Sequence, residues 1–234
     1  MTKEIQLAVL AGLDFPALMA FRRVSKDCKT LVMLVLETEF KRLLSGIAKN
    51  MELFRCALEE YEAVIGGYAA LAFFTRIELP ADHAIQLFLP AWAFTPMLFH
   101  MQIVQEATLV RETDIGLIER GLVSSARLRT ASRDVVLFQS SKSSAMVPIL
   151  HGPNTTLMCY ISATHFGVPW PRLTFTGRGL IGDFPAGGAI SAALLKTRGF
   201  DFKLYPWMWE DGGIPQEWEP AWGFINTFQI QPIV

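Results

Sequence analysis

The sequence predicts an α+β fold in which a helical N-terminal segment packs on a mixed-sheet domain. Of the 234 residues, 51% are hydrophobic and only 18% are charged, which is enough apolar material for a large core. The first sixty or so residues are charged and helical in pattern, whereas the remainder is poor in charge and rich in Gly and Pro. This shift predicts three parts, which are a helical segment at 1–48, the mixed-sheet domain at 49–205, and a Trp-rich acidic segment at 206–234 that packs on the domain.

The N-terminal segment has the pattern of amphipathic helices. Asp14 and Pro16 stand where a helix would start, because Asp caps helix N-termini and Pro fits the first turn. Apolar residues then recur at helical spacing, while the opposite face carries charges. The apolar positions are Leu18, Phe21, Val24, Cys28, Leu31, Val32 and Val35. A further helix is expected over residues 52–61.

The predicted domain begins with a short apolar run that ends at Gly66-Gly67, followed by a helix that carries Leu71, Phe73 and Phe74. Strands are expected at 85–89 and 135–139, with a helix at 97–105 and a variable segment at 108–132 between them. Residues 155–162 predict a strand or a short helix. A last helix is expected near 189–198.

Charge and cysteine content restrict the classes of function. The 21 Lys and Arg against 22 Asp and Glu give a formal charge of -1, so we expect no nucleic-acid partner. The three cysteines form no CxxC pair, which predicts reduced thiols and a cytoplasmic or nuclear location. Residues 83–105 carry no Asp, Glu, Lys or Arg, but Pro90 and Pro96 interrupt them, so we interpret them as core and predict no membrane span.

Several residues are candidates for chemistry, each with a structural alternative. Gly66 and Gly67 can bind a phosphate through backbone N–H groups or simply form a tight turn. Asp82 with His83 can be a metal or acid–base pair or a surface loop. The histidines His100, His151 and His165 can be general bases or hydrogen-bonded core residues. Arg172 and Arg178, or Arg127, Arg129 and Arg133, can form an anion site or a solvated face. The Trp-rich tail can be a lid, a partner surface or a packed terminus.

The polar run His151 to Thr155 stands in an apolar stretch, where polar groups must find partners or line a cavity; here we favour the structural role.

Motifs of the GxSxG, HExxH, P-loop and GxGxxG types do not occur in the sequence.

Residues 4–36 resemble the later helices of an F-box. The residues that carry the resemblance are Leu13, Asp14, Leu18, Arg23, Val24, Ser25 and Lys26. The resemblance implies docking on the Skp-type adaptor of a cullin ubiquitin ligase, with Leu13, Leu18 and Val24 as partner-binding residues. The alternative is an amphipathic helical pair that caps the main domain.

Residues 53–205 look like a group of fungal, basidiomycete proteins that join an F-box-like start to a degenerate nucleotidyltransferase-like domain. The matching pieces are VIGGYAALAFF, IQLFLP, VVLFQSSKSSAMVPILHGPNTTLMCYIS, VPWPRLTF and KTRGFDF. The resemblance implies that Gly66 and Gly67 match the glycine motif that holds the nucleotide phosphates. The two metal-binding carboxylate positions of the next strand fall on Ala84 and Gln86, which leaves Asp82 nearby and Asp134 on a later strand as weak metal candidates.

Three functional hypotheses follow. The first is a non-catalytic pseudo-nucleotidyltransferase, a pseudoenzyme that acts as a binding or adaptor protein with no cofactor. The second is a remodelled transferase in which Asp82 and Asp134 hold one Mg²⁺, with His151 as a further catalytic candidate. The third uses the former nucleotide cleft for biosynthetic chemistry on an apolar small molecule, which the charge-poor core and 17 Phe favour.

Overall fold

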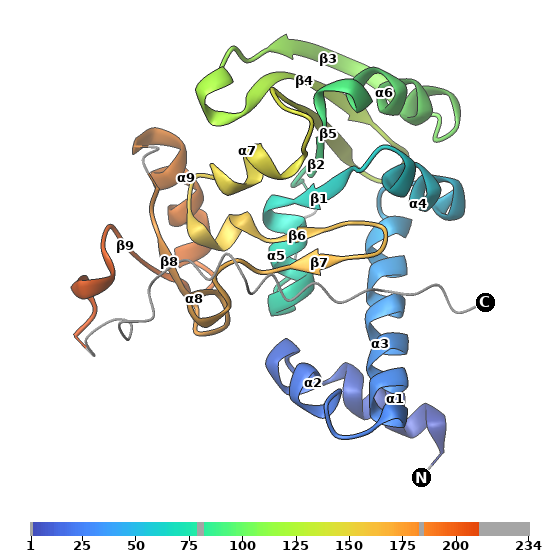
Figure 1. Cartoon of the computed structure of the whole chain (residues 1–234), viewed down its shortest axis with the longest axis vertical. Helices are drawn as coiled ribbons and strands as arrows, with labels where there is room; N and C mark the ends of the chain where they lie inside the picture. Colours follow the sequence, from blue (N-terminus) through green and yellow to red (C-terminus); the bar gives the residue numbers. More distant parts are fainter. Residues whose placement is uncertain (1, 79–81, 183–184, 211–234) are drawn as a thin grey trace.

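The computed structural model of the chain describes residues 2–78, 82–182 and 185–210, and they form a mixed α/β fold (Figure 1). A seven-stranded mixed sheet has the strand order β3-β4-β5-β2-β1-β6-β7, and a second, two-stranded sheet pairs β8 with β9 in parallel. Helices cover the large sheet, and the N-terminal helices extend away from it. The α+β class expected from the sequence is thus confirmed at this level.

Four helices open the chain, at α1 (Lys3–Ala11), α2 (Phe15–Phe21), α3 (Lys26–Ser45) and α4 (Met51–Glu60). The side chain of Asp14 accepts a hydrogen bond from Ala17 N at 2.8 Å, and Pro16 lies in the first turn of α2, as the sequence indicates. The continuous helical pattern nevertheless breaks at residues 22–25. Ser25 adopts an extended conformation and its hydroxyl caps Cys28 N, so a new helix starts there.

The predicted strand, glycine turn and helix are confirmed. Strand β1 (Val64–Gly66) runs into α5 (Gly67–Thr75), and β2 (Ile85–Leu89) then pairs antiparallel with β1, placing Gln86 beside Gly66. Strand β5 (Asp134–Ser140) lies on the other side of β2 and parallel to it. The two predicted strands are therefore neighbours in the centre of the sheet.

The segment expected to be variable, 108–132, instead forms an antiparallel pair of strands. These are β3 (Thr108–Asp114), at one edge of the sheet, and β4 (Leu122–Arg129), with the one-turn helix η2 (Ile118–Arg120) between them. Every residue of β3 is exposed or half-buried, so the strand lacks the apolar alternation that would reveal it. Before it, η1 (Ala91–Ala93) leads into α6 (Phe94–Ile103), close to the predicted helix.

The rest of the chain consists of short elements. They are α7 (Met146–Leu150), η3 (Thr155–Met158), β6 (Tyr160–Ile161), β7 (Phe166–Gly167), α8 (Pro171–Phe175), β8 (Arg178–Leu180), α9 (Pro185–Lys196), β9 (Asp201–Lys203) and η4 (Pro206–Met208). Residues 155–162 contain both a short helix and a strand, the two alternatives that the sequence left open.

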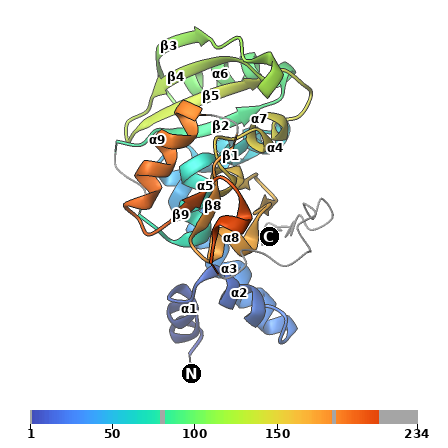
Figure 2. The ribbon, with the colours of Figure 1, turned by 90° about the vertical axis from the view of Figure 1, so that its left-hand side faces the viewer.

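One hydrophobic core joins the N-terminal helices to the sheet. Phe15 of α2 contacts Phe74 of α5 and Phe166 of β7 edge to face, with ring centroids 5.0 and 5.6 Å apart. Helix α3 contributes five fully or almost fully buried side chains to the same cluster, namely Val32, Val35, Leu36, Phe40 and Leu44. The long α3 therefore connects the tip formed by α1 and α2 with the sheet (Figures 1 and 2).

Residues 83–105, which carry no acidic or basic side chain, fold as β2, η1 and α6 with short connections. Among the residues that the structure describes, no helix combines the length and the apolar character needed to cross a membrane.

Candidate functional site

The glycine turn between β1 and α5 is the first candidate site. Gly66 is extended, and Gly67 has a φ of 62°, a left-handed conformation that favours glycine. Side chains of β2 occupy the space in front of both residues. A Cβ on Gly66 would lie 2.6 Å from the ring of Phe88, and a Cβ on Gly67 would lie 2.0 Å from Gln86 Oε1. The turn is covered by protein rather than open to a phosphate.

An apolar cluster lies on the same face of the sheet as Gly66 and spans strands β1, β2 and β5. Its buried members are Val64, Phe88, Ala145, Ile149 and Tyr160. Phe138 of β5 stacks on Phe88 with ring centroids 5.1 Å apart, and α7 supplies Ile149, which also lies close to Gly66. We call this set the Phe88 cluster. Phe88 and Ile149 of this cluster lie against Gly66, one of the two glycines to which the resemblance assigns phosphate binding.

At the positions where metal-binding carboxylates are expected, the structure has an uncharged side chain and an ion-paired acid. Gln86 stands on the same face of β2 as Phe88, and the pairing of β2 with β5 brings Asp134 next to the position of Ala84. Both carboxylate oxygens of Asp134 accept hydrogen bonds from arginines, from Arg127 Nε at 2.8 Å and from Arg129 Nε at 2.9 Å. The hydrogen bonds and charges of Arg129 and Arg127 lower the pKa of the Asp134 carboxyl.

Asp82 lies at the surface in the turn before β2, and its neighbour His83 is half-buried against α5. The His83 ring contacts the Tyr68 ring edge to face, with ring centroids 4.2 Å apart. Burial lowers the pKa of His83, and the charge of Asp82 partly offsets this effect. The Tyr68 hydroxyl in turn donates to the Ser191 carbonyl of α9 at 3.1 Å. No group of three His, Cys, Asp or Glu side chains with metal-binding geometry occurs within residues 2–78, 82–182 and 185–210.

Asn154 is the centre of a buried polar network. Its amide nitrogen donates to Ser191 Oγ at 2.8 Å, and its Oδ1 accepts from Thr156 Oγ1 at 2.6 Å and from Leu157 N at 3.1 Å. Thr155 Oγ1 accepts from Leu180 N at 2.9 Å. Asn154 and Thr155 thus tie η3 to α9 and β8, which is the structural role favoured for them from the sequence.

The histidines occupy separate places. His151 is exposed at the C-terminal end of α7. The half-buried His100 of α6 contacts Gln105, with Nε2 atoms 3.0 Å apart, and burial lowers its pKa. His165 Nδ1 lies 2.7 Å from Thr164 Oγ1 in the β6–β7 turn. The three imidazoles therefore belong to three different parts of the fold.

The two arginines proposed for an anion site also lie in different elements. Arg172 is exposed on α8, and Arg178 is half-buried on β8. The Arg178 guanidinium lies over the Trp209 ring at 5.2 Å from its centroid. Trp209 is buried, whereas Trp207 is largely exposed. The rest of the Trp-rich tail, residues 211–234 with Trp218 and Trp222, lies outside the described residues.

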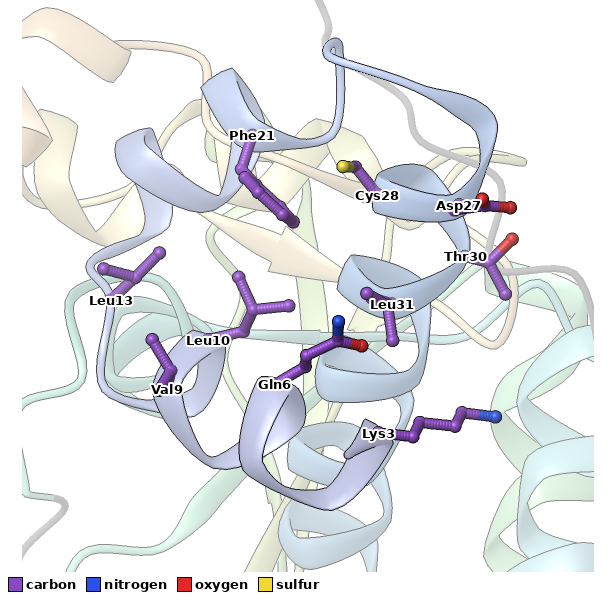
Figure 3. Close-up of a pocket in the computed structure, with 10 residues that line it drawn as sticks. All are labelled: Lys3, Gln6, Val9, Leu10, Leu13, Phe21, Asp27, Cys28, Thr30 and Leu31. Atoms are coloured by element: carbon purple, nitrogen blue, oxygen red, sulfur yellow. The ribbon is translucent and has the colours of Figure 1, made fainter. Parts of the chain in front are cut away.

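The N-terminal helices form an apolar groove of about 620 Å³ between α1, the end of α2 and the start of α3 (Figure 3). Its walls include Val9, Leu13, Phe21 and Leu31, and Lys3 and Asp27 stand at its rim. We call it the α1–α3 groove. Of the three residues expected to bind a partner, Leu13 lines this groove, Val24 is 71% exposed, and Leu18 is fully buried in the core.

Comparison of the chain with protein-family models, with curated proteins and with solved structures gives no match. The fold and the candidate sites define a mixed α/β protein with a strand–glycine–helix turn, an apolar cluster against that turn, and an apolar groove between its N-terminal helices.

Sequence reasoning found the glycine pair and named Gln86 on the next strand, but it did not predict that Gln86 and Phe88 lie against the two glycines. Gln86 and Phe88 alternate on β2, and the antiparallel register of β1 and β2 aligns Gly66 with Gln86. The signal present in the sequence was a polar and an aromatic residue two positions apart in an otherwise aliphatic strand.

Proposed function

We propose that this protein is a non-catalytic, nucleotidyltransferase-like binding protein whose N-terminal helices dock a partner. One observation carries the first half of the proposal, which is the placement of Phe88 and Gln86 directly over Gly66 and Gly67. A phosphate bound by the α5 N-terminus would have to displace both side chains. Phe88 is fixed by its stack on Phe138, so its displacement would cost the packing of the Phe88 cluster.

The carboxylate chemistry supports the same proposal. A two-metal clamp needs several carboxylates that face one point, because divalent cations prefer charged oxygen ligands. Of the candidate acids, Asp134 is neutralised by Arg127 and Arg129, and Asp82 stands in an exposed turn. The carboxylate position expected on β2 carries the uncharged Gln86. These residues favour ligand binding or scaffolding over nucleotidyl transfer.

The α1–α3 groove supports the proposal that the N-terminal helices dock a partner. It is lined by aliphatic and aromatic side chains, of which Val9 is largely exposed, and Ile5 of α1 and Val24 between α2 and α3 are exposed as well. Apolar surface grouped in this way is typical of protein interaction sites. Together with the F-box-like residues Leu13 and Val24, it favours a Skp-type ubiquitin-ligase adaptor as the partner.

The first experiment tests the covered glycine turn. The purified chain is heated with each nucleoside triphosphate in the presence of Mg²⁺ or Mn²⁺, and its melting temperature is followed. A ligand that binds only the native state raises the melting temperature by mass action. We expect no saturable shift, because Phe88 and Gln86 lie against the two glycines that would bind the phosphates. A metal-dependent, saturable shift would contradict the non-catalytic proposal and revive the transferase hypothesis.

The second experiment tests the partner by calorimetric titration with a recombinant Skp-type adaptor. We expect binding that Val24→Asp weakens at least about ten-fold, because a charge placed in an apolar interface must lose its hydration. The matched control is Val110→Asp on β3, where the native side chain is 50% exposed on another part of the surface. Absence of binding, or equal effects of the two substitutions, would contradict the proposal that the N-terminal helices bind a Skp-type adaptor. The proposal that the domain is non-catalytic would be unaffected.

A further inference from the structure

A second cavity lies between the C-terminal half of α3, helix α5 with the residues that follow it, and the β4–β5 turn. Its volume is about 570 Å³, within the range of small-molecule sites. It shares no lining residue with the α1–α3 groove and contains neither glycine of the β1–α5 turn. We call it the arginine pocket, because three arginines from three elements line it, namely Arg42, Arg76 and Arg133.

Among the three arginines of the pocket, Arg133 has a buried Nε atom without a hydrogen-bond partner in the part of the chain that the structure describes. Its Nε is shielded from solvent, and no hydrogen-bond acceptor within the described residues reaches it. The atom lies close to the end of α3, 3.7 Å from the point where a Cβ on Gly46 would be. A guanidinium N–H that is buried without an acceptor costs free energy, and an anion in the pocket would remove that cost.

Arg76 also lines the pocket, and its backbone conformation is unusual. It caps α5 with a φ of 57°, a left-handed value that is uncommon for a residue other than glycine. Its guanidinium donates to the carbonyl of Ala11, at the end of α1. This contact places a second cation at the pocket and connects the pocket to the N-terminal helices.

The remaining walls are of two kinds. Leu43, Ala69, Ala72, Phe73 and Ile77 supply an apolar surface. Of the two acids, Glu39 is already engaged, because its Oε2 accepts from Arg42 at 2.8 and 3.0 Å. Glu78 is exposed at the end of the lining segment. Arg76 and Arg133 are therefore the two arginines of the pocket that form no ion pair with Glu39, and their positive charges share the pocket with aliphatic and aromatic groups.

We propose that the arginine pocket binds a small amphipathic anion. Arg133 holds its carboxylate or phosphate head, Arg76 adds positive charge to the same pocket, and the wall formed by Leu43, Phe73 and Ile77 receives its apolar body. A guanidinium suits both kinds of head, because its planar donors match two oxygens of either group. This inference goes beyond the proposed function, since it concerns a different cavity and needs neither the adaptor nor the covered glycine turn.

The test uses four probes at sub-micellar concentration in calorimetric titrations of the full chain. Decanoate and decyl phosphate carry head and tail, inorganic phosphate carries the head alone, and decanol carries the tail alone. We expect decanoate or decyl phosphate to bind at one molecule per chain and decanol to bind at least about ten-fold more weakly, because it lacks the charge-assisted hydrogen bonds. The comparison of the first two probes shows which head the pocket prefers.

Three substitutions locate the binding. Arg133→Gln should weaken the better probe about ten-fold or more, because one charge-assisted contact is lost. Arg23→Gln changes the same charge on an exposed residue outside the pocket, and Val9→Ser alters the α1–α3 groove; both should leave the affinity unchanged. Binding that survives Arg133→Gln, equals that of decanol, or disappears in Val9→Ser would overturn the proposal, as would absence of binding by every probe.

The melting temperature without ligand provides an independent measurement. Arg133→Gln removes a buried donor that has no protein acceptor, so we expect the empty protein to be at least as stable as the wild type. A folded variant with unchanged stability and lost binding supports a ligand-binding role. A lower melting temperature in Arg133→Gln would instead show that this arginine acts in folding, and would overturn its assignment to the ligand.

Discussion

Asn154→Ala tests the buried network that fixes α9 to the rest of the domain. The Asn154 side chain is completely buried and takes part in three hydrogen bonds, two as acceptor and one as donor. At about 1 kcal/mol for each bond, the substitution costs about 3 kcal/mol, and more if the donors Thr156 Oγ1 and Leu157 N find no other acceptor. For a chain of this length, that loss lowers the melting temperature by roughly 6–12 °C.

The assay is urea unfolding followed by far-UV circular dichroism, with thermal unfolding as a second probe. Asn50→Ala is the matched control, because the Asn50 side chain makes one exposed N-cap hydrogen bond to Leu53 N at 3.1 Å. Loss of such a cap costs about 1 kcal/mol. Equal losses for Asn154→Ala and Asn50→Ala would refute the reasoning, because the buried network would then contribute no more than a surface cap.

Three further predictions concern single sites. Gly67→Ala should lower stability measurably in urea unfolding, because alanine disfavours the φ of 62° and its Cβ would collide with Gln86; unchanged stability would show that Gln86 moves freely. Burial lowers the pKa of His100, so the unfolded chain binds its proton more readily, and stability should fall as the pH drops through about 6.5 and below; His100→Gln should flatten that part of the profile of melting temperature against pH. Burial raises the pKa of the Cys159 thiol to about 12, so a disulfide reagent should modify the exposed Cys56 in the native protein and reach Cys159 only after unfolding.

The central part of the fold follows from local sequence signals. The aliphatic runs of β2 and β5 and the glycine pair before α5 were sufficient to predict strand, turn and helix, because each carries a pattern that its own neighbours in sequence determine. The break between α2 and α3 was missed, although Ser25 is a good N-cap residue. An uninterrupted apolar stripe runs past it, and the stripe alone predicts one helix.

The β3–β4 hairpin shows what local signals leave out. Its strands hold polar and charged residues on both faces, so the sequence between 108 and 132 reads as irregular. Their position is determined by contacts distant in sequence, above all the pairing of β4 with β5, which sets Arg127 and Arg129 beside Asp134. The role of Asp134 changes for the same reason. An acid judged alone is a metal candidate, whereas an acid between two arginines is an ion-paired structural residue.

The candidate site depends on register in a similar way. Gly66 and Gly67 can be found in the sequence, but whether they meet a phosphate or a side chain is decided by which residue of β2 lies beside them. The arginine pocket was beyond local reasoning altogether. Arg42, Arg76 and Arg133 are far apart along the chain and meet only because α3, α5 and the β4–β5 turn converge.

The position of α3 bears on how a partner at the N-terminal helices would be coupled to the domain. Its inner side chains, such as Leu36 and Phe40, are at most 2% exposed and belong to the same core as Ile65 and Leu87 of the sheet. Residues 1–48 on their own would expose this apolar face to water, at a cost of roughly 25 cal/mol for each Å². The helical segment and the sheet therefore depend on each other for stability. A partner docked in the α1–α3 groove would therefore be held in a fixed orientation to the domain, as the proposed adaptor role requires, and a ligand in the arginine pocket would lie against the same helix.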